Sequence, residues 1–161
     1  LLGAWWAGAD VTLAADPDAE LALVHGDRID EAGDVPEILA FSLDAFGKPV
    51  PDLPVGVTDY ASSVRVHGDQ FTPSGQQGAL EGRSVGEVLT AARARAEAHS
   101  LAAGDRVLST LAWGNADELI DGLLSVLVSG SSLVQVNRPD ASKVDRRSET
   151  EKVSKTLSSL Q

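Results

Sequence analysis

The sequence has no cysteine and no methionine among its 161 residues, and only 4% of them are aromatic. Without cysteine there is no disulfide framework, no thiolate nucleophile and no cysteine-bound metal. The hydrophobic share of 43% is nevertheless enough to bury a core in a chain of this length. These absences leave an ordinary globular domain as the expected class.

Basic side chains are also scarce, because 13 Lys and Arg face 24 Asp and Glu, for a net charge of −11. A surface of this sign repels nucleic acid and anionic lipid. No run approaches the roughly 20 apolar residues of a membrane span. The apolar start has Asp10 inside it and no basic segment before it, unlike a signal peptide. We expect a cytoplasmic protein with no nucleic-acid or membrane partner.

Residues 104–141 predict a strand, a helix and a second strand. Arg106–Leu111 is a short apolar run after a Gly-Asp turn, and Leu133–Val136 is a second one. Asn115 is a good helix N-cap, with Glu118 three residues on. Helical spacing and a closing glycine follow in Leu119, Ile120, Leu123, Leu124, Leu127, Val128 and Gly130. Two strands joined in this way normally lie parallel with a right-handed crossover.

The start of the chain repeats the end of this unit. Leu1–Ala19 aligns with Leu123–Ala141 without a gap, and the identical positions of the first segment are Leu1, Leu2, Gly8, Pro17, Asp18 and Ala19. The shared order of apolar helix, glycine, strand and Pro-Asp-Ala predicts a duplicated α/β half. On this alignment the chain begins inside a helix, and roughly 40 residues of a first βαβ unit precede it. The lack of an initiator methionine fits this expectation.

We therefore expect one α/β domain over residues 1–161, truncated at its amino end. Its layered, mostly parallel sheet would be flanked by helices and built from two pseudo-repeated βαβ halves. The halves would be 1–45 and 57–161, joined by the proline-rich connection 46–56.

The first half is expected to hold a buried helix end and three strands, at Leu1–Gly8, Val11–Ala15, Leu21–Val24 and Ile38–Leu43. Ile38–Leu43 is apolar enough to predict burial on both sheet faces. Asp27–Gly33 reads as a turn or one helical loop.

The second half opens with an ambiguous segment, Thr58–Val66, which fits a helix capped by Thr58 or an alternating strand; we favour the helix. Gly68–Gly82 is expected to be a loop. Ser84 and Glu87 then form a capping box for a helix that ends near His99. The tail, 142–161, carries more basic than acidic side chains. An apolar stripe of Val153, Leu157 and Leu160 predicts an amphipathic terminal helix that docks on the acidic body or on a partner.

The loop Ser74–Gly82, which precedes this capped helix, carries a family resemblance. Its order resembles the phosphate-binding loop of adenylate-forming enzymes (acyl-CoA synthetases, luciferases and peptide-synthetase adenylation domains), Ser-Gly-Thr-Thr-Gly-x-Pro-Lys-Gly. The matching positions are Ser74, Gly75, Gly78 and Gly82. The segments GDRVLSTLAW, SGSSLVQVNRPD and LLGAWWAGADVTL also look like that family. The resemblance identifies the chain as a member of a small actinobacterial family that is faintly similar to the amino-terminal, AMP-binding domain of these enzymes.

The departures from the family pattern bear on function. The family's two Thr hydroxyls are replaced by Gln76 and Gln77, and Glu81 stands at the position of its Lys. A carboxylate there repels phosphate. The chain also has no Tyr-Gly-x-Thr-Glu adenine motif, no Thr-Gly-Asp ribose motif and no lid with a catalytic Lys. Taken by itself, the Ser74–Gly82 segment fits an ordinary glycine-rich connection better.

Other side chains that could carry chemistry have plain structural alternatives. His25, His67 and His99 are isolated, and His67 with Asp69 supplies two metal ligands at most, so no metal site is assigned. The carboxylates Asp117, Glu118 and Asp121 stand where the dipole of a helix favours negative charge.

Three more residues lie near the end of the expected strand Arg106–Leu111: Ser109 and Thr110 within it, and Trp113 after it. Ser109 and Thr110 lie at the strand end where α/β folds place ligands, but no base is identifiable for them. Trp113 can line a pocket or pack in the core. No catalytic residue is assigned.

The resemblance and its departures together suggest a non-catalytic relative of the adenylate-forming amino-terminal domain, serving as a binding or regulatory module without a cofactor. One alternative is an active acyl-adenylating enzyme or subunit that uses ATP or AMP with Mg²⁺. A second alternative is a protein-interaction module that self-associates or binds a partner chain.

Overall fold

The computed structural model describes residues 1–75 and 77–158. The chain divides into two compact units: unit 1 comprises Leu1–Leu13 and the chain from Pro73 onward, and unit 2 is Ala14–Thr72. The proline-rich segment 46–56, expected to join two halves, lies inside unit 2 and contains neither helix nor strand.

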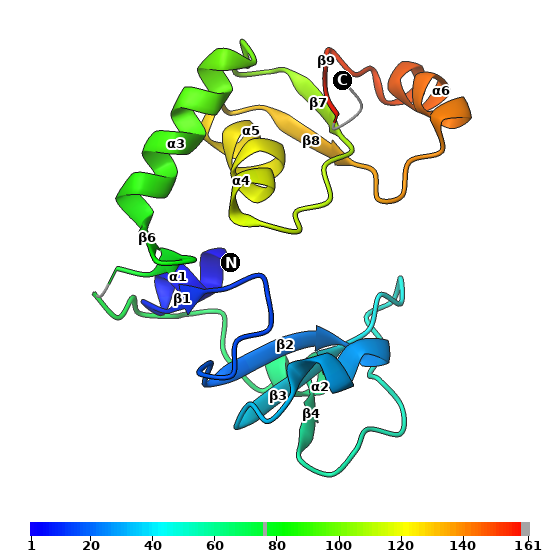
Figure 1. Cartoon of the computed structure of the whole chain (residues 1–161). Helices are drawn as coiled ribbons and strands as arrows, with labels where there is room; N and C mark the ends of the chain where they lie inside the picture. Colours follow the sequence, from blue (N-terminus) through cyan, green and yellow to red (C-terminus); the bar gives the residue numbers. More distant parts are fainter. Residues whose placement is uncertain (76, 159–161) are drawn as a thin grey trace. The chain divides into compact units, whose positions relative to one another are not determined.

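The fold is α/β, as the sequence predicts, with strands that pair mostly in parallel (Figure 1). The described strands form three sheets of three, with the orders β1-β5-β6, β2-β3-β4 and β8-β7-β9. Of the strand pairs in residues 1–75 and 77–158, only β5 and β6 run antiparallel. The expected layers are thus divided among small sheets, two in unit 1 and one in unit 2.

The predicted βαβ unit is confirmed. β7 (Arg106–Ser109) and β8 (Ser132–Gln135) pair in parallel, in a register that sets Val107 beside Leu133. One continuous helical stretch joins them through α4 (Ala116–Leu119), a π-helical turn η2 (Ile120–Leu124) and α5 (Ser125–Val128). The side chain of Asn115 caps it by accepting from the Glu118 N–H at 2.9 Å.

The prediction for the tail is right for its first part only. Helix α6 spans Ala141–Glu151 and ends at Lys152, whose φ of +55° turns the chain. Beyond it, β9 (Lys155–Leu157) pairs in parallel with β7. Leu157 is buried against Val107, so its apolar side chain belongs to the sheet and not to a helical stripe. Leu160 lies outside the described residues.

Helix α3 (Val85–Ala98) begins with the predicted capping box. The Ser84 side chain accepts from the Glu87 N–H, and the Glu87 carboxylate accepts from the Ser84 N–H at 2.9 Å. α3 packs with α4, η2 and β5 around a core of buried residues: Leu80, Val88, Ala92, Ala116, Leu119, Ile120 and Leu124. Seven of the fourteen buried hydrophobic residues described in unit 1 belong to this cluster.

The start of unit 1 differs from expectation. Helix α1 (Leu2–Trp6) buries none of its residues, and Trp6 is 55% exposed. Strand β1 is short (Asp10–Val11) and pairs in parallel with β5 (Ala79–Leu80), which turns into β6 (Arg83–Ser84). The expected loop, Gly68–Gly82, therefore includes β5 and the turn of a β-hairpin.

The local structure of the aligned segments is alike. α1 and α5 are each followed by a glycine with positive φ, 79° at Gly8 and 73° at Gly130, and then by a strand, β1 or β8. Glycine adopts this conformation without the clash that a Cβ would bring. The duplication itself stays a prediction.

Unit 2 is a parallel sheet of β2 (Leu21–His25), β3 (Glu37–Phe41) and β4 (Val57–Asp59). The 3-10 helix η1 (Gly26–Ala32) and helix α2 (Tyr60–Val64) complete it. The helix expected at Thr58 begins two residues later, because the Asp59 carboxylate caps it and Thr58 belongs to β4.

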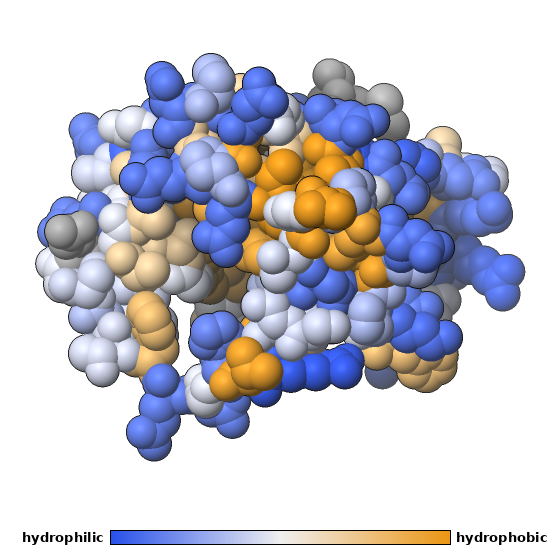
Figure 2. Space-filling model, turned by 90° about the horizontal axis from the view of Figure 1, so that it is seen from below, coloured by the Kyte–Doolittle hydropathy of each residue, from blue (hydrophilic) through white to orange (hydrophobic). Residues whose placement is uncertain are grey.

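The sheet of unit 2 is less covered than its sequence suggests. Only Ala40 of β3 is buried, which makes the prediction of burial on both faces wrong. Leu21 and Leu23, alternate residues on one face of β2, are 46% and 53% exposed. Figure 2, which views the molecule from below relative to Figure 1, shows apolar residues (orange) gathered on part of this surface. Among the described residues, no helix has the length and apolar character needed to cross a membrane.

Asp105 lies just before β7 and is hydrogen-bonded to Ser154, just before β9, and this contact makes the stability of unit 1 depend on pH. Its carboxylate accepts from the Ser154 hydroxyl at 2.7 Å and from the Ala102 N–H at 2.9 Å. The Ser154 hydrogen bond, followed by that from Ala102, lowers the pKa of Asp105 below its usual 3.8.

A lowered carboxyl pKa stabilises the fold above the unfolded-state value, and the contribution is lost as pH falls through the folded-state value. We therefore expect unit 1 to lose stability below about pH 3.8, and Asp105→Asn to flatten that loss. Urea midpoints between pH 6 and pH 2 measure it. Identical profiles for the two proteins would contradict the assignment.

Candidate functional site

The Ser74–Gly82 segment lies along the first residues of the chain. The N–H of Ser74 donates to the Trp6 carbonyl at 3.3 Å. Farther on, the N–H of Ala79 and of Glu81 donate to the carbonyls of Ala9 and Val11, at 3.4 and 2.9 Å. These donors belong to the pairing of β5 with β1, so they do not form a free cradle for phosphate.

Gly78 lies where two backbones come closest. A Cβ built on it would be 2.5 Å from the Ala9 carbonyl oxygen and 2.8 Å from the Trp5 ring. Trp5 itself donates its indole N–H to the Ala79 carbonyl at 2.9 Å. Only glycine fits this position, for a reason that involves no ligand.

The other matched glycines occupy turns. Glu81 and Gly82, with φ of 50° and 76°, form the two-residue connection between β5 and β6, as a type I′ hairpin requires. Gly75 also has a positive φ, 77°. Gln76 lies outside the described residues, and the Gln77 side chain is exposed.

The residues at the carboxyl end of β7 are packed, not presented to a ligand. Ser109 is fully buried, and its hydroxyl accepts from the Leu111 N–H at 3.3 Å. The Thr110 hydroxyl donates to Ser158 at 3.3 Å. Trp113 packs against both core clusters of unit 1, and its indole nitrogen would be 2.8 Å from a Cβ at position 122. Of the two interpretations for Trp113, the structure supports core packing.

The three carboxylates near α4 serve three separate contacts. Asp117 forms an ion pair with Arg83 at 2.8 Å, which lowers the pKa of Asp117. Glu118 accepts from the Gly114 N–H at 2.8 Å, and Asp121 pairs with His99 at 2.7 Å between its Oδ1 and the His Nε2. The pairing of His99 with Asp121 joins α3 to η2. No pattern in the sequence indicated this pair.

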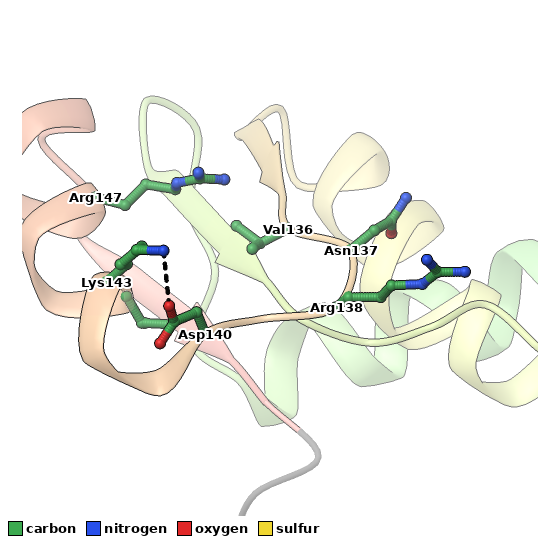
Figure 3. Close-up of a pocket in the computed structure, with 7 residues that line it drawn as sticks. Val136, Asn137, Arg138, Asp140, Lys143 and Arg147 are labelled. Atoms are coloured by element: carbon green, nitrogen blue, oxygen red, sulfur yellow. Dashed lines mark ion pairs between the residues drawn. The ribbon is translucent and has the colours of Figure 1, made fainter. Parts of the chain in front are cut away.

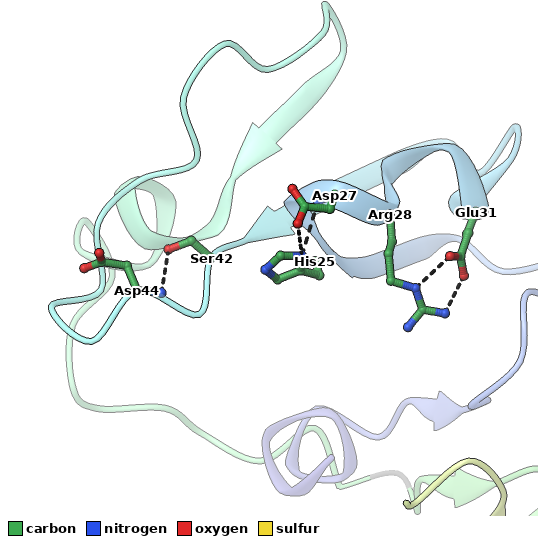
Figure 4. A network of polar contacts seen from close by, with 6 residues as sticks. All are labelled: His25, Asp27, Arg28, Glu31, Ser42 and Asp44. Carbon is green, nitrogen blue, oxygen red and sulfur yellow. Dashed lines mark hydrogen bonds and ion pairs between the residues drawn. The ribbon is translucent and has the colours of Figure 1, made fainter. Parts of the chain in front are cut away.

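The remaining histidines are held in local turns. His25 accepts from the Asp27 N–H at 3.2 Å, and Figure 4 shows it beside the Arg28–Glu31 ion pair in unit 2. His67 and Asp69 are exposed. Within residues 1–75 and 77–158, no three His, Asp or Glu side chains come together as metal ligands.

A pocket that sequence reasoning missed lies between the segment after β8 and helix α6. We call it the α6 pocket; it is lined by Val136, Asn137, Arg138, Asp140, Lys143 and Arg147, together with the partly buried Val144. Its volume is about 220 Å³. Figure 3 shows Lys143 and Arg147 reaching from α6 on one side of Val136, with Arg138 and Asn137 on the other. Its only sequence signal was the basic excess of the tail.

A comparison with known proteins decides the family of this chain. The chain is 50% identical over 165 residues to a TIGR03089 family protein of Mycobacterium tuberculosis, across 98% of this chain and 68% of that protein. The chain belongs to the TIGR03089 family. No protein-family model matches it. No solved structure matches it either.

Within this TIGR03089 family chain, the structure assigns packing or turn roles to most residues singled out from the sequence. Gly78 packs, Gly75 and Gly82 turn, and Ser109 is buried. The alignment with the TIGR03089 family protein spans 98% of this chain. Because packing and turns account for the residues named above, the α6 pocket is the candidate site of unit 1.

Proposed function

We propose that the chain is a non-catalytic relative of the amino-terminal domain of adenylate-forming enzymes, and that it serves as a ligand-binding module. The order α3, β7, α4–α5 and β8 supports the resemblance drawn from the sequence segments. The hydrogen bonding of the Ser74–Gly82 segment supports the absence of catalysis, because the N–H groups of Ala79 and Glu81 donate to the carbonyls of Ala9 and Val11 and are not available to a phosphate.

The charge of this segment supports the same proposal. Glu81 stands where the resembled family has Lys, and it is part of a tight hairpin turn. Two like charges about 4 Å apart repel by about 1 kcal/mol even at the dielectric constant of water. A nucleotide phosphate would therefore meet an unfavourable side chain as well as engaged backbone donors.

Neither ATP nor Mg²⁺ is part of this proposal. A cytoplasmic location and a protein or self-association partner stay predictions from the sequence. The exposed Leu21 and Leu23 of unit 2 favour the partner over an isolated chain.

The test is ATP–pyrophosphate exchange by the full chain across a panel of carboxylic acids, with an adenylate-forming enzyme as the positive control. We expect exchange no faster than without protein. Glu81→Lys should leave this unchanged, because a new cation does not release the N–H groups of Ala79 and Glu81. Robust exchange by the native chain would overturn the proposal, and exchange gained by Glu81→Lys would refute the backbone argument.

A further inference from the structure

The α6 pocket concentrates positive charge on an acidic protein. Three cations, Arg138, Lys143 and Arg147, line it together with one carboxylate, Asp140, whereas the whole chain has a net charge of −11. Acidic surfaces attract cations and repel anions at long range. A cationic pocket on such a surface selects for anions that bind through short, specific contacts.

The carboxylate of Asp140 is already satisfied. Its Oδ1 accepts from the Ser142 N–H at 3.1 Å and from the Ser142 hydroxyl at 2.6 Å, and its Oδ2 pairs with Lys143 at 2.9 Å. Lys143 first, and then Ser142, lower the pKa of Asp140, so the carboxyl stays ionised as the partner of Lys143. The Asp140–Lys143 pair therefore leaves the charge of the two arginines uncompensated.

Arg138 and Arg147 have no hydrogen-bond or ion-pair partner within the described part of the chain. Arg28, Arg83 and Arg106 each pair with a carboxylate, and Arg93, Arg95 and Arg146 are unpaired among the described residues but do not line the pocket. A guanidinium offers five N–H donors in a planar fork that matches phosphate oxygens. Two such forks without protein partners leave donors available to a ligand.

The backbone at Arg138 is in the left-handed region, with φ of 50°. Such a conformation costs about 1–3 kcal/mol for a residue other than glycine, and it is frequent at binding sites. It occurs two residues after the buried Val136, whose N–H donates to the Ser109 carbonyl at 2.9 Å. Hydrogen bonding to the sheet thus holds the chain in place up to Val136, and Arg138, with its left-handed backbone, lines the pocket two residues later.

The location agrees with the general position of ligand sites in α/β folds. Adjacent strands β7 and β8 lead into α4 and α6, and β9 lies on the opposite side of β7 from β8. Right-handed crossovers in these two directions send their helices to opposite faces, which opens a crevice at the carboxyl ends. The α6 pocket lies at the carboxyl end of β8.

We propose that the α6 pocket binds a small phosphate-bearing molecule, with Arg147 as its main contact. The inference deepens the proposed function by naming the ligand class. A cavity of about 220 Å³ is smaller than the roughly 300–1,000 Å³ of pockets for drug-sized ligands. A phosphate or diphosphate group with little else attached fits this size, and Val136 and Val144 supply an apolar floor.

The test is calorimetric titration of the full chain with inorganic phosphate, pyrophosphate and succinate at constant ionic strength. We expect saturable binding of phosphate or pyrophosphate, and Arg147→Ala should weaken it about tenfold, the loss of one charge-assisted contact. Arg146→Ala is the matched control, because it removes the same charge from the neighbouring residue, which does not line the pocket. It should change the affinity less than about twofold.

Equal losses in the two arginine variants would show unspecific attraction and overturn the site. The absence of saturable binding to the native chain would do the same, and succinate binding as tight as pyrophosphate would overturn the ligand class. Comparing phosphate with pyrophosphate distinguishes a single phosphoryl group from a diphosphate. None of these outcomes depends on adenylation, so failure here is distinguishable from exchange activity, which would refute the proposed function.

Discussion

Replacing Leu80 with alanine should destabilise unit 1 by about 3 kcal/mol, within the roughly 2.7–5 kcal/mol measured for buried leucines. Leu80 is fully buried in β5, where it packs with Val88 and Ile120. Its truncation removes apolar contacts and leaves a cavity between the hairpin and the helices. The measurement is the urea midpoint and slope, followed by tryptophan fluorescence, since Trp5, Trp6 and Trp113 all lie in unit 1.

Leu127→Ala is the matched control, because it makes the same change in the same unit at a side chain that is 46% exposed. It should cost less than about 1 kcal/mol. A loss below about 1 kcal/mol for Leu80→Ala as well would contradict the placement of Leu80 in the core. The Ser74–Gly82 segment would then be an exposed loop, as a ligand-binding reading of the sequence requires.

Local signals were sufficient to predict the βαβ unit. The N-cap at Asn115, the capping box at Ser84 and Glu87, and the closing Gly130 all act within a few residues of the helix they bound. Each can be predicted from the sequence because its hydrogen bonds, or the φ angle it requires, involve residues close together in the chain. The confirmed α/β class follows from these elements.

Contacts between distant residues could not be predicted in the same way. Leu157 has helical spacing to Val153, yet it pairs in β9 because β7 offers a free edge about 48 positions earlier, as in the Ser154–Arg106 hydrogen bond. Non-local pairing of this kind overrides a short periodic pattern. The same limit hid the pairing of His99 with Asp121.

The candidate site shows this limit most clearly. Sequence order drew attention to Ser74, Gly75, Gly78 and Gly82, because a motif is a local pattern. The α6 pocket is formed by the segment after β8 and by a helix face, and its cations are spread over several turns. The excess of basic residues in the tail could be seen in the sequence, but the position of Lys143 and Arg147 beside Val136 could be seen only in the structure.

Gly78→Ala should destabilise unit 1 by about 3 kcal/mol, the upper part of the range for overpacked sites. The added Cβ would be 2.5 Å from the Ala9 carbonyl oxygen and 3.0 Å from the Trp5 Cα, and both are backbone atoms that no rotamer change can move. Relief requires β1 to separate from β5, which also weakens the hydrogen bond from the Trp5 indole to Ala79. The measurement is again the urea midpoint.

Gly86→Ala is the control for this variant. A Cβ at Gly86 has its nearest neighbour, the Ser84 hydroxyl, at 4.0 Å, and the position lies in the first turn of α3. Alanine there should be neutral or should stabilise by up to about 1 kcal/mol through helix propensity. The contrast separates a steric requirement for glycine from a general effect of adding a methyl group.

The Gly78 result also decides how the family resemblance is interpreted. If Gly78 is retained so that a phosphate can approach the backbone, Gly78→Ala should leave the urea midpoint unchanged and affect ligand binding alone. If it is retained because the Trp5–Ala9 segment crosses there, stability should fall with or without nucleotide. The second outcome would mean that packing requires glycine at this position, whether or not the segment binds phosphate.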